Sequence, residues 1–294
     1  MKNTNQIIQI ILVTGATGHQ GGAVAKNLLE QNKFAVRALV RNKMSDKAKA
    51  LEESGAELTE GDFNNTASLE KALQNVHGVF SMQDFKNGTD TEIAQGKALA
   101  DAAKKTGVKH FVYSSVGSAE RNTGIPHFES KYQVEEHIRK IGLPYTILRP
   151  VFFMYNYNGM RQMIESGTLY TPLSAGKKLQ QLSEDDYGKM VADAFADTNK
   201  FIGKEIEVAS VDITMEEVAE NFSSVLDKHV SYQQIPFGAF QKQAGEEVTT
   251  MFRWFENVGY NARLNELEDT FFKLTSLKDY LNKHEWNKNT AVIH

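Results

Sequence analysis

Residues 10–22 read Ile-Ile-Leu-Val-Thr-Gly-Ala-Thr-Gly-His-Gln-Gly-Gly, an apolar run followed by glycines at the spacing Gly-x-x-Gly-x-x-Gly. A buried strand that turns through such glycines into a helix is typical of dinucleotide binding. Glycine permits the tight turn, lets the backbone approach a pyrophosphate and allows the helix to pack closely on the strand. The N–H groups and dipole of the helix N-terminus favour the anion. An ordinary turn is the alternative interpretation. We expect the pyrophosphate to be held by Gly15, Ala16, Thr17, Gly18, His19, Gln20 and Gly21.

Apolar runs of strand length alternate with longer amphipathic stretches through the first half of the chain, which predicts a parallel sheet with helices on both faces. The expected strands are Ile7–Thr14, Ala35–Val40, Glu57–Glu60, Gly78–Ser81, His110–Ser115 and Tyr145–Arg149. The expected helices are Gln20–Gln31, Met44–Ser54, Thr66–Gln74, Thr91–Thr106 and Phe128–Ile141. Gly107, and Gly142 with Pro144, are stop signals for the last two helices. We therefore expect an α/β fold of the Rossmann type, a doubly wound sheet of six parallel strands with five crossovers.

After Pro150 the pattern becomes irregular and aromatic over Val151–Tyr157, and strands and helices no longer alternate. The expected short strands are Lys178–Gln181, Ile206–Ala209 and Val230–Gln234. The expected helices are Glu184–Ala196 from the N-cap Ser183, Met215–Leu226 from Thr214 with a capping box at Glu217, Phe237–Asn257, and Leu277–Lys283. This predicts a dinucleotide-binding domain over 1–150 and a smaller α+β domain over 151–294, with segments that return to the main sheet and a cleft shared by both.

The composition is that of an ordinary folded protein. Of 294 residues, 33 are Lys or Arg and 37 are Asp or Glu, which gives a net charge of −4 with both signs scattered along the chain, so no nucleic-acid contact is expected. The absence of cysteine excludes disulfides, thiolate metal sites and cysteine nucleophiles. The apolar run Ile7–Val13 is too short for a signal peptide or membrane span. We expect a cytoplasmic protein without membrane contact.

The end of the second predicted strand bears on the choice of nicotinamide cofactor. An acid there would bind the adenosine ribose hydroxyl and repel a 2′-phosphate, but the sequence has Arg37, Arg41 and Lys43 instead. Arg41 stands where a guanidinium could grip the phosphate, which favours NADP(H), although all three cations could be solvated surface charges. Asp62 and Phe63 follow the third strand and would border the adenine, unless Asp62 only caps a turn. Met82 and Gln83, after the fourth strand, would lie beside the dinucleotide.

In these motifs the chain resembles the NmrA-like branch of the atypical short-chain dehydrogenase/reductases, over nearly its whole length. The resemblance rests on residues 13–21, 40–42, 61–62, 112–115, 127–136 and 148–150, on Phe152, Phe153 and Asn156, and on 207–210 and 214–219. It implies a Rossmann-type NADP(H) domain with a small C-terminal domain that closes over the nicotinamide end. It also implies that Lys131, with the loop containing Phe152, Phe153 and Asn156, lies on the nicotinamide side of the cofactor.

The catalytic pattern of conventional short-chain reductases is incomplete in this chain. They carry Tyr-x-x-x-Lys on one helix, so that the lysine lowers the pKa of a tyrosine that passes a proton. Lys131 matches the lysine, but His127 occupies the tyrosine position, and Tyr132 points ~100° away around the helix. His127 is a candidate general acid, because its ordinary pKa of about 6.5 suits proton transfer, or else a capping or surface residue. Ser114, at the end of the fifth strand, either contacts the ligand or completes the strand end.

Two functions remain open from the sequence. The missing tyrosine favours an NADP(H)-binding redox sensor or regulator that acts through a protein partner. The alternative is an NADPH-dependent reductase of a quinone or conjugated carbonyl, because such an acceptor takes its proton from water. The aromatic cluster Phe152, Phe153, Met154, Tyr155 and Tyr157 could line an apolar acceptor pocket or form core. No metal-ligand spacing or Gly-x-Ser-x-Gly elbow is found, so metal catalysis and hydrolysis have no support.

Overall fold

The structure is a computed structural model that describes residues 8–287, and these residues divide into two compact units. The first unit runs as far as Arg149 and also includes Tyr187–Ile206. The second comprises Pro150–Asp186 and the chain from Glu207 onward. The segment 187–206 thus belongs to the first unit, whereas the pattern of the sequence places it in the second predicted domain.

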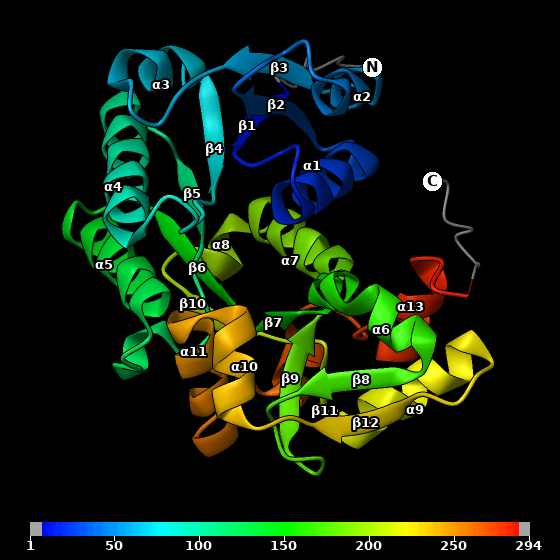
Figure 1. Ribbon diagram of the computed structural model, residues 1–294. Helices are drawn as coiled ribbons and strands as arrows, with labels where there is room; N and C mark the ends of the chain where they lie inside the picture. The colour runs from blue at the N-terminus through cyan, green and yellow to red at the C-terminus, as the bar shows by residue number, and fades with distance from the viewer. Residues whose placement is uncertain (1–7, 288–294) are drawn as a thin grey trace. The chain divides into compact units, whose positions relative to one another are not determined.

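A seven-stranded sheet forms the centre of the first unit, in the order β10-β6-β5-β4-β1-β2-β3 (Figure 1). The pairs β1–β2, β1–β4, β2–β3, β4–β5 and β5–β6 are all parallel, so the predicted six-stranded Rossmann sheet is confirmed. The seventh strand, β10, is the predicted strand Ile206–Ala209, which joins this sheet beside β6. The strands are β1 Gln9–Val13, β2 Phe34–Val40, β3 Glu57–Glu60, β4 Val76–Ser81, β5 His110–Ser114, β6 Tyr145–Pro150 and β10 Glu205–Val208.

Helices connect these strands close to their predicted positions. Gly107 ends α4 in the left-handed region at φ 76°, as expected for a C-cap glycine. The second helix starts two residues later than predicted, because the Ser45 hydroxyl accepts from Ala48 N–H and caps it there. The helices are α1 His19–Gln31, α2 Asp46–Glu53, α3 Thr66–Ala72, α4 Thr89–Thr106, η1 Ala119–Arg121, α5 Pro126–Lys140, α7 Glu184–Ala196 and α8 Thr198–Phe201.

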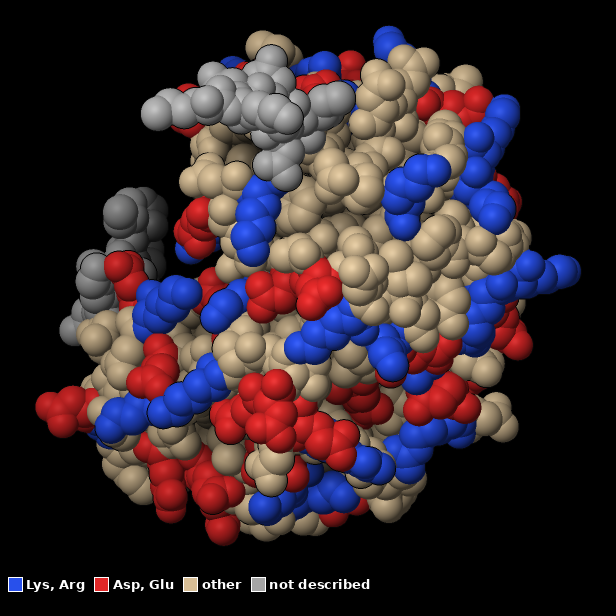
Figure 2. Space-filling view, turned by 180° about the vertical axis from the view of Figure 1, so that it is seen from behind, with Lys and Arg blue, Asp and Glu red and all other residues tan. Residues whose placement is uncertain are grey.

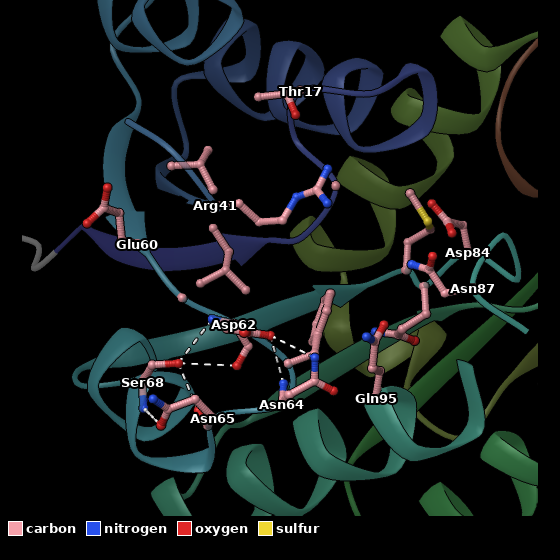
Figure 3. Close-up of a pocket in the computed structure, with 17 residues that line it drawn as sticks. Thr17, Arg41, Glu60, Asp62, Asn64, Asn65, Ser68, Asp84, Asn87 and Gln95 are labelled. Atoms are coloured by element: carbon pink, nitrogen blue, oxygen red, sulfur yellow. Dashed lines mark hydrogen bonds between the residues drawn. The ribbon is translucent and has the colours of Figure 1, made fainter. Parts of the chain in front are cut away.

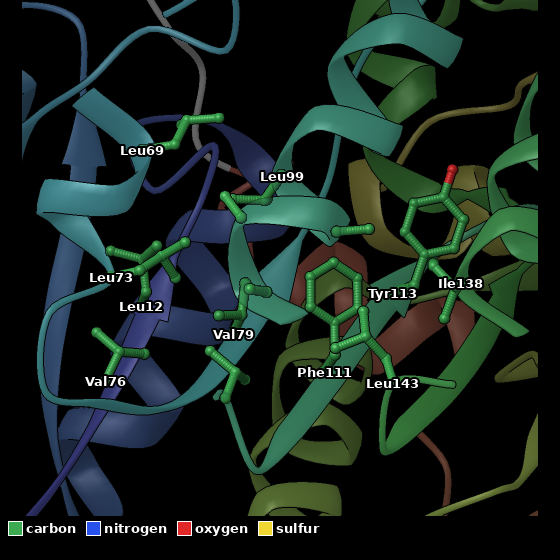
Figure 4. Packing of buried hydrophobic residues seen from close by; sticks show 14 of the residues in the cluster. Leu12, Leu69, Leu73, Val76, Val79, Leu99, Phe111, Tyr113, Ile138 and Leu143 are labelled. Atoms are coloured by element: carbon green, nitrogen blue, oxygen red, sulfur yellow. The ribbon is translucent and has the colours of Figure 1, made fainter. Parts of the chain in front are cut away.

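The hydrophobic core of the first unit lies between the sheet and the helices α3, α4 and α5 (Figure 4). Leu12, Val79 and Phe111 contribute from β1, β4 and β5, while Leu99 and Ile138 contribute from α4 and α5; all five are fully buried. Burial of these strands on both faces requires the continuous apolar runs seen in the sequence. The core holds the carboxyl ends of β1, β2 and β4 together at one edge of the sheet, where ligands bind in open α/β folds.

The second unit contains a three-stranded sheet, β11-β9-β7, and the pair β12-β8. The capping box of Thr214 and Glu217 is present, and Ser183 accepts from Asp185 and Asp186 N–H at the start of α7, as predicted. The single helix predicted over Phe237–Asn257 is wrong, because Gly245 at φ 82° breaks it into two. The elements are β7 Phe152–Phe153, η2 Met154–Met160, α6 Arg161–Ser166, β8 Thr168–Thr171, β9 Lys178–Leu182, β11 Val211–Thr214, α9 Met215–Leu226, β12 Ser231–Gln234, α10 Phe237–Ala244, α11 Glu246–Asn257, α12 Leu264–Thr270 and α13 Leu277–Lys283.

Charged side chains of both signs are interspersed on the face shown in Figure 2. On that face the cations do not gather into a continuous basic surface of the kind that binds a phosphate backbone. Between residues 8 and 287, no helix combines the length and the apolar character needed to cross a membrane.

Candidate functional site

The glycine turn between β1 and α1 leaves no space for a side chain at its third glycine, Gly21. Gly15 adopts φ 62°, and its carbonyl accepts from Gly18 N–H at 2.8 Å. A Cβ on Gly21 would lie 2.4 Å from the backbone of Gly15 and of Thr14, so the helix could not pack this closely on the turn. Gly18 is the N-cap of α1 and supplies no side-chain acceptor for the first N–H groups of the helix. A helix N-terminus of this kind, with no capping side chain, favours an anion.

A cavity of about 700 Å³ adjoins this turn (Figure 3). It brings together the turn after β1, the end of β2, the loop after β3, the end of β4 and the start of α4. β1 lies between β2 and β4, so the cavity is at the point where the strand order reverses. Its lining residues are Gly15, Thr17, Leu39, Val40, Arg41, Glu60, Gly61, Asp62, Phe63, Asn64, Asn65, Ser68, Met82, Gln83, Asp84, Asn87 and Gln95.

The structure separates the cations that the sequence grouped at the end of β2. Arg41 follows directly after β2 and lines the cavity. Arg37 points elsewhere: it donates to the carbonyls of Ala72 and Gln74, both at 2.8 Å, and its Nε lies 3.0 Å from a carboxylate oxygen of Glu57. Arg37 therefore closes the end of α3 and is not a solvated charge, while Arg41 is a cation of the cavity wall.

The acidic side of the cavity is built on a turn after β3. Asp62 Oδ1 accepts from Asn64 N–H at 2.9 Å and from Asn64 Nδ2 at 3.1 Å, so the alternative role of Asp62 as a turn cap is present. Ser68 Oγ accepts from Asp62 N–H at 3.0 Å, which fixes the loop on α3 (Figure 3). Sequence reasoning missed Asn64, Asn65 and Ser68, because polar residues at a helix start look like ordinary capping.

Thr14 is a further residue that the sequence analysis did not single out. Its Oγ1 accepts from Met82 N–H at 2.8 Å and donates to Met82 O at 3.2 Å, so it ties the end of β1 to the end of β4. The Met82 side chain packs over Gly15, where an added Cβ would lie 2.5 Å from its Cε. These contacts set the distance between the glycine turn and the wall formed by Met82 and Gln83.

Lys131 is held by groups from two other elements. Its Nζ donates to Gln83 O at 3.1 Å and lies 2.8 Å from Glu92 Oε1. Glu92 comes from α4 and is fully buried, and its second oxygen accepts from Ser130 Oγ. Because Gln83 lines the cavity, Lys131 lies directly behind the cavity wall. No pattern in the sequence marks Glu92, because a glutamate in the first turn of a helix usually faces water.

His127 and the tyrosines do not form the usual acid. His127 is 6% exposed, so it is not a surface residue, and its ring stacks on Phe85 at 4.3 Å. Tyr132 lies under the Arg139 guanidinium at 5.3 Å. Tyr113, on β5, is fully buried, and burial together with the carboxylates of Glu92 and Glu135 raises its pKa well above the usual range. A phenol in that state keeps its proton.

The two serines at the end of β5, Ser114 and Ser115, contact other side chains. Ser114 Oγ donates to Gln20 Oε1 at 2.9 Å, which links β5 to the start of α1. Ser115 Oγ donates to the buried carboxylate of Glu135 at 2.5 Å. Burial raises the pKa of Tyr187, and a hydrogen bond with Ser114 opposes that shift. The predicted contact of Gln20 and Ser114 with a cofactor stays a prediction.

The aromatic segment after β6 packs within the second unit. Phe152 meets Tyr157 edge-on at 5.7 Å and Phe255 at 6.4 Å, and Phe153 stacks on Tyr155 at 5.1 Å. Much of this aromatic cluster therefore forms hydrophobic core, which was the alternative to its lining an apolar acceptor pocket. Asn156 is exposed. That Phe152, Phe153 and Asn156 contact the nicotinamide stays a prediction.

Comparisons with known proteins agree with this architecture. The sequence pattern of the NmrA-like family matches residues 8–282. An NmrA-like family domain-containing protein of Dictyostelium discoideum is 30% identical over 292 residues, 93% of this chain and 97% of that protein. Triphenylmethane reductase of Citrobacter sp., solved in complex with NADP(H), has a TM-score of 0.80 and 27% identity, over 94% of this chain and 99% of that one. NmrA, a negative transcriptional regulator solved with NADP, shares the fold with a TM-score of 0.78 at 24% identity, over 94% of each chain.

Proposed function

Because the chain belongs to the NmrA-like family, we propose that it binds NADP(H) in the cavity of the first unit and is an NADPH-dependent reductase of an electron-poor conjugated acceptor. The observation that carries the proposal is the glycine turn on a cavity of about 700 Å³ whose β2 edge ends in Arg41 and not in an acid. The similar triphenylmethane reductase of Citrobacter sp. was solved with NADP(H), which supports the same cofactor here.

The residues of the cavity fit this cofactor. The turn from Gly15 to Gly21 would hold the pyrophosphate at the N-terminus of α1, and a Cβ on Gly21 would destroy the close packing of that turn. Arg41 would pair with the 2′-phosphate in a bidentate manner. Asp62 and Phe63 would border the adenine, and Met82 and Gln83 would follow the path of the dinucleotide. Lys131, with Nζ fixed beside Gln83 O, would donate to the ribose at the nicotinamide end.

When bound, NADPH supplies a hydride, and the chain has to orient it and its acceptor. A quinone or similarly conjugated acceptor accepts the hydride at carbon or oxygen, and a proton from water completes the reduction, so no tyrosine acid is required. This agrees with His127 at the tyrosine position and with the buried, protonated state of Tyr113. His127, stacked on Phe85, stays a candidate acid only for acceptors that need one.

A redox sensor is the second candidate, and one observation favours it. The helix that carries Lys131 lacks the catalytic tyrosine, which a sensor of the NADPH/NADP ratio does not need. In that case occupancy of the cavity would act on a protein partner through the second unit. The fold shared with the regulator NmrA is compatible with this candidate but does not favour it over a reductase.

The decisive experiment titrates the protein with NADPH and NADH and then adds a panel of quinones while the nicotinamide absorbance is followed. Arg41→Ala should weaken NADPH binding at least about tenfold and change NADH binding little, because a charge-assisted pair with the phosphate is lost. Lys43→Ala is the matched control, an exposed cation two residues further on that does not line the cavity. Equal loss of both cofactors in Arg41→Ala would refute the assignment of Arg41. Steady NADPH oxidation supports the reductase, and tight binding without turnover supports the sensor.

A further inference from the structure

The two helices behind the cavity wall approach each other unusually closely next to Lys131. A Cβ on Gly96 of α4 would lie 2.7 Å from the side chain of Val134 on α5, so a larger residue would separate the helices. Glu92 is one turn before Gly96, and Lys131 is about one turn before Val134. The close approach therefore brings a carboxylate of α4 to the ammonium of α5 at 2.8 Å.

The carboxylate of Glu92 is completely removed from solvent. Glu92 is 0% exposed, and the side chain of Lys131 is only 11% exposed. A buried carboxylate costs free energy unless it is paired and hydrogen-bonded. Here Oε1 forms an ion pair with the Lys131 ammonium, and Oε2 accepts a hydrogen bond from the Ser130 hydroxyl. The pair also limits where the ammonium can go, because Nζ must reach Glu92 and Gln83 O together.

We propose that Glu92 is the positioning residue of Lys131, and that it directs the lysine ammonium to the nicotinamide-side ribose of the bound dinucleotide. This inference rests on the proposed NADP(H) site and adds a residue to it. Glu92 itself does not line the cavity and acts only through Lys131. Its loss should therefore weaken contacts with the nicotinamide half and leave the adenosine half unchanged.

The test compares two ligands and two buried glutamates. Glu92→Gln should weaken NADPH binding about tenfold, the usual worth of a hydrogen bond to a charged group, and leave the affinity for 2′,5′-ADP unchanged, because that probe lacks the nicotinamide ribose. Glu135→Gln is the matched control. Glu135 is also 0% exposed and also pairs with a serine, Ser115, and with cations, Arg139 and Arg149, but the Lys131 ammonium pairs with Glu92 and not with the Glu135 carboxylate.

A double-mutant cycle completes the test. Lys131→Met should show the same selective loss as Glu92→Gln, and the double variant should bind NADPH no worse than Lys131→Met alone. If Glu92→Gln is too unstable to titrate, Glu92→Asp replaces it, because the shorter carboxylate no longer reaches Nζ at 2.8 Å. The same selective loss is then expected.

Several results would overturn the inference. They are unchanged NADPH binding in Glu92→Gln, equal weakening of both ligands, the same selectivity in Glu135→Gln, or losses that multiply in the double variant. If the unaltered protein binds both 2′,5′-ADP and NADPH, and Glu92→Gln binds them with the same affinities, only the proposed role of Glu92 is wrong. If the unaltered protein binds neither ligand, the proposed NADP(H) site is wrong and the inference falls with it.

Discussion

His110 should make the first unit sensitive to mild acid. The residue lies on β5, is fully buried, and has Nε2 2.7 Å from Thr146 Oγ1. Since that hydroxyl donates to Phe201 O at 2.8 Å, its oxygen accepts from His110, and the neutral ring carries its proton on Nε2. Nδ1 has no hydrogen-bond partner among the described residues. Burial, and next the charge of His77, lower the pKa of His110 from 6.5 to about 4.

The lowered pKa means that the unfolded chain takes up the proton before the folded chain does. The stability that neutral His110 provides is therefore complete above pH 6.5 and is lost as the pH falls from 6.5 through 4. The full loss corresponds to about 3 kcal/mol, of which about 1.8 kcal/mol falls between pH 7 and pH 5.

Urea unfolding at pH 7 and at pH 5 measures this difference. His110→Gln keeps a donor for Thr146 but cannot titrate, so its loss of unfolding free energy between the two pH values should be smaller than that of the unaltered protein by about 1.8 kcal/mol. His229→Gln replaces an exposed histidine and should behave like the unaltered protein. An identical pH dependence in all three proteins would refute the argument, as would an NMR titration of His110 with an unshifted pKa.

Two further predictions concern the glycine turn and an ion pair of the second unit. Gly21→Ala should reduce the free energy of unfolding by about 1–3 kcal/mol and the affinity for NADPH by at least about tenfold, because the added Cβ would lie 2.4 Å from the Gly15 backbone. Gly22→Ala is the control and should change both quantities much less, because its Cβ would lie 3.3 Å from the nearest atom, a carbonyl oxygen. Equal effects of the two variants in calorimetric titration would contradict this prediction. The hydrogen bond from His284, and next the ammonium of Lys283, lower the pKa of Asp185 to about 2, so these contacts together support a stabilisation of about 2 kcal/mol that is complete above pH 3.8 and is lost as the pH falls through 2. His284→Gln should raise that pKa in a carboxyl-carbon NMR titration, and an unmoved titration would count against the pair.

Local patterns carried most of the fold prediction. The alternation of apolar runs and amphipathic stretches predicted six parallel strands, and caps such as Thr214 with Glu217 predicted helix ends to the residue. These signals are local because a cap or a strand period involves only residues a few positions apart. The same locality explains the error at Gly245, where one glycine with a positive φ interrupts a pattern that otherwise continues as a helix.

The site was predicted unevenly for the same reason. Gly15, Thr17, Arg41, Asp62, Phe63, Met82 and Gln83 all line one cavity, because residues at the carboxyl ends of neighbouring parallel strands must meet there. Glu92 and Thr14 carry no such mark in the sequence. Their roles depend on partners 39 and 68 residues away, Lys131 and Met82, and only helix packing and strand pairing bring these together.

By itself, the sequence determined the strand–glycine–helix unit, the order of the parallel strands along the chain and the absence of an acid after the second strand. These features depend only on backbone conformation and residue type at neighbouring positions. Only the tertiary structure decided which charges belong to the site. Positions 37 and 41 are both arginine. Pairing of β2 with β3 nevertheless places Arg37 opposite Glu57, whereas Arg41 lies in the cavity wall. Likewise, the position of Glu92 in the first turn of a helix predicts an exposed side chain, but packing of α4 on α5 buries it against Lys131. The free energy of a charge depends on what surrounds it, and those surroundings come from segments far apart in the chain.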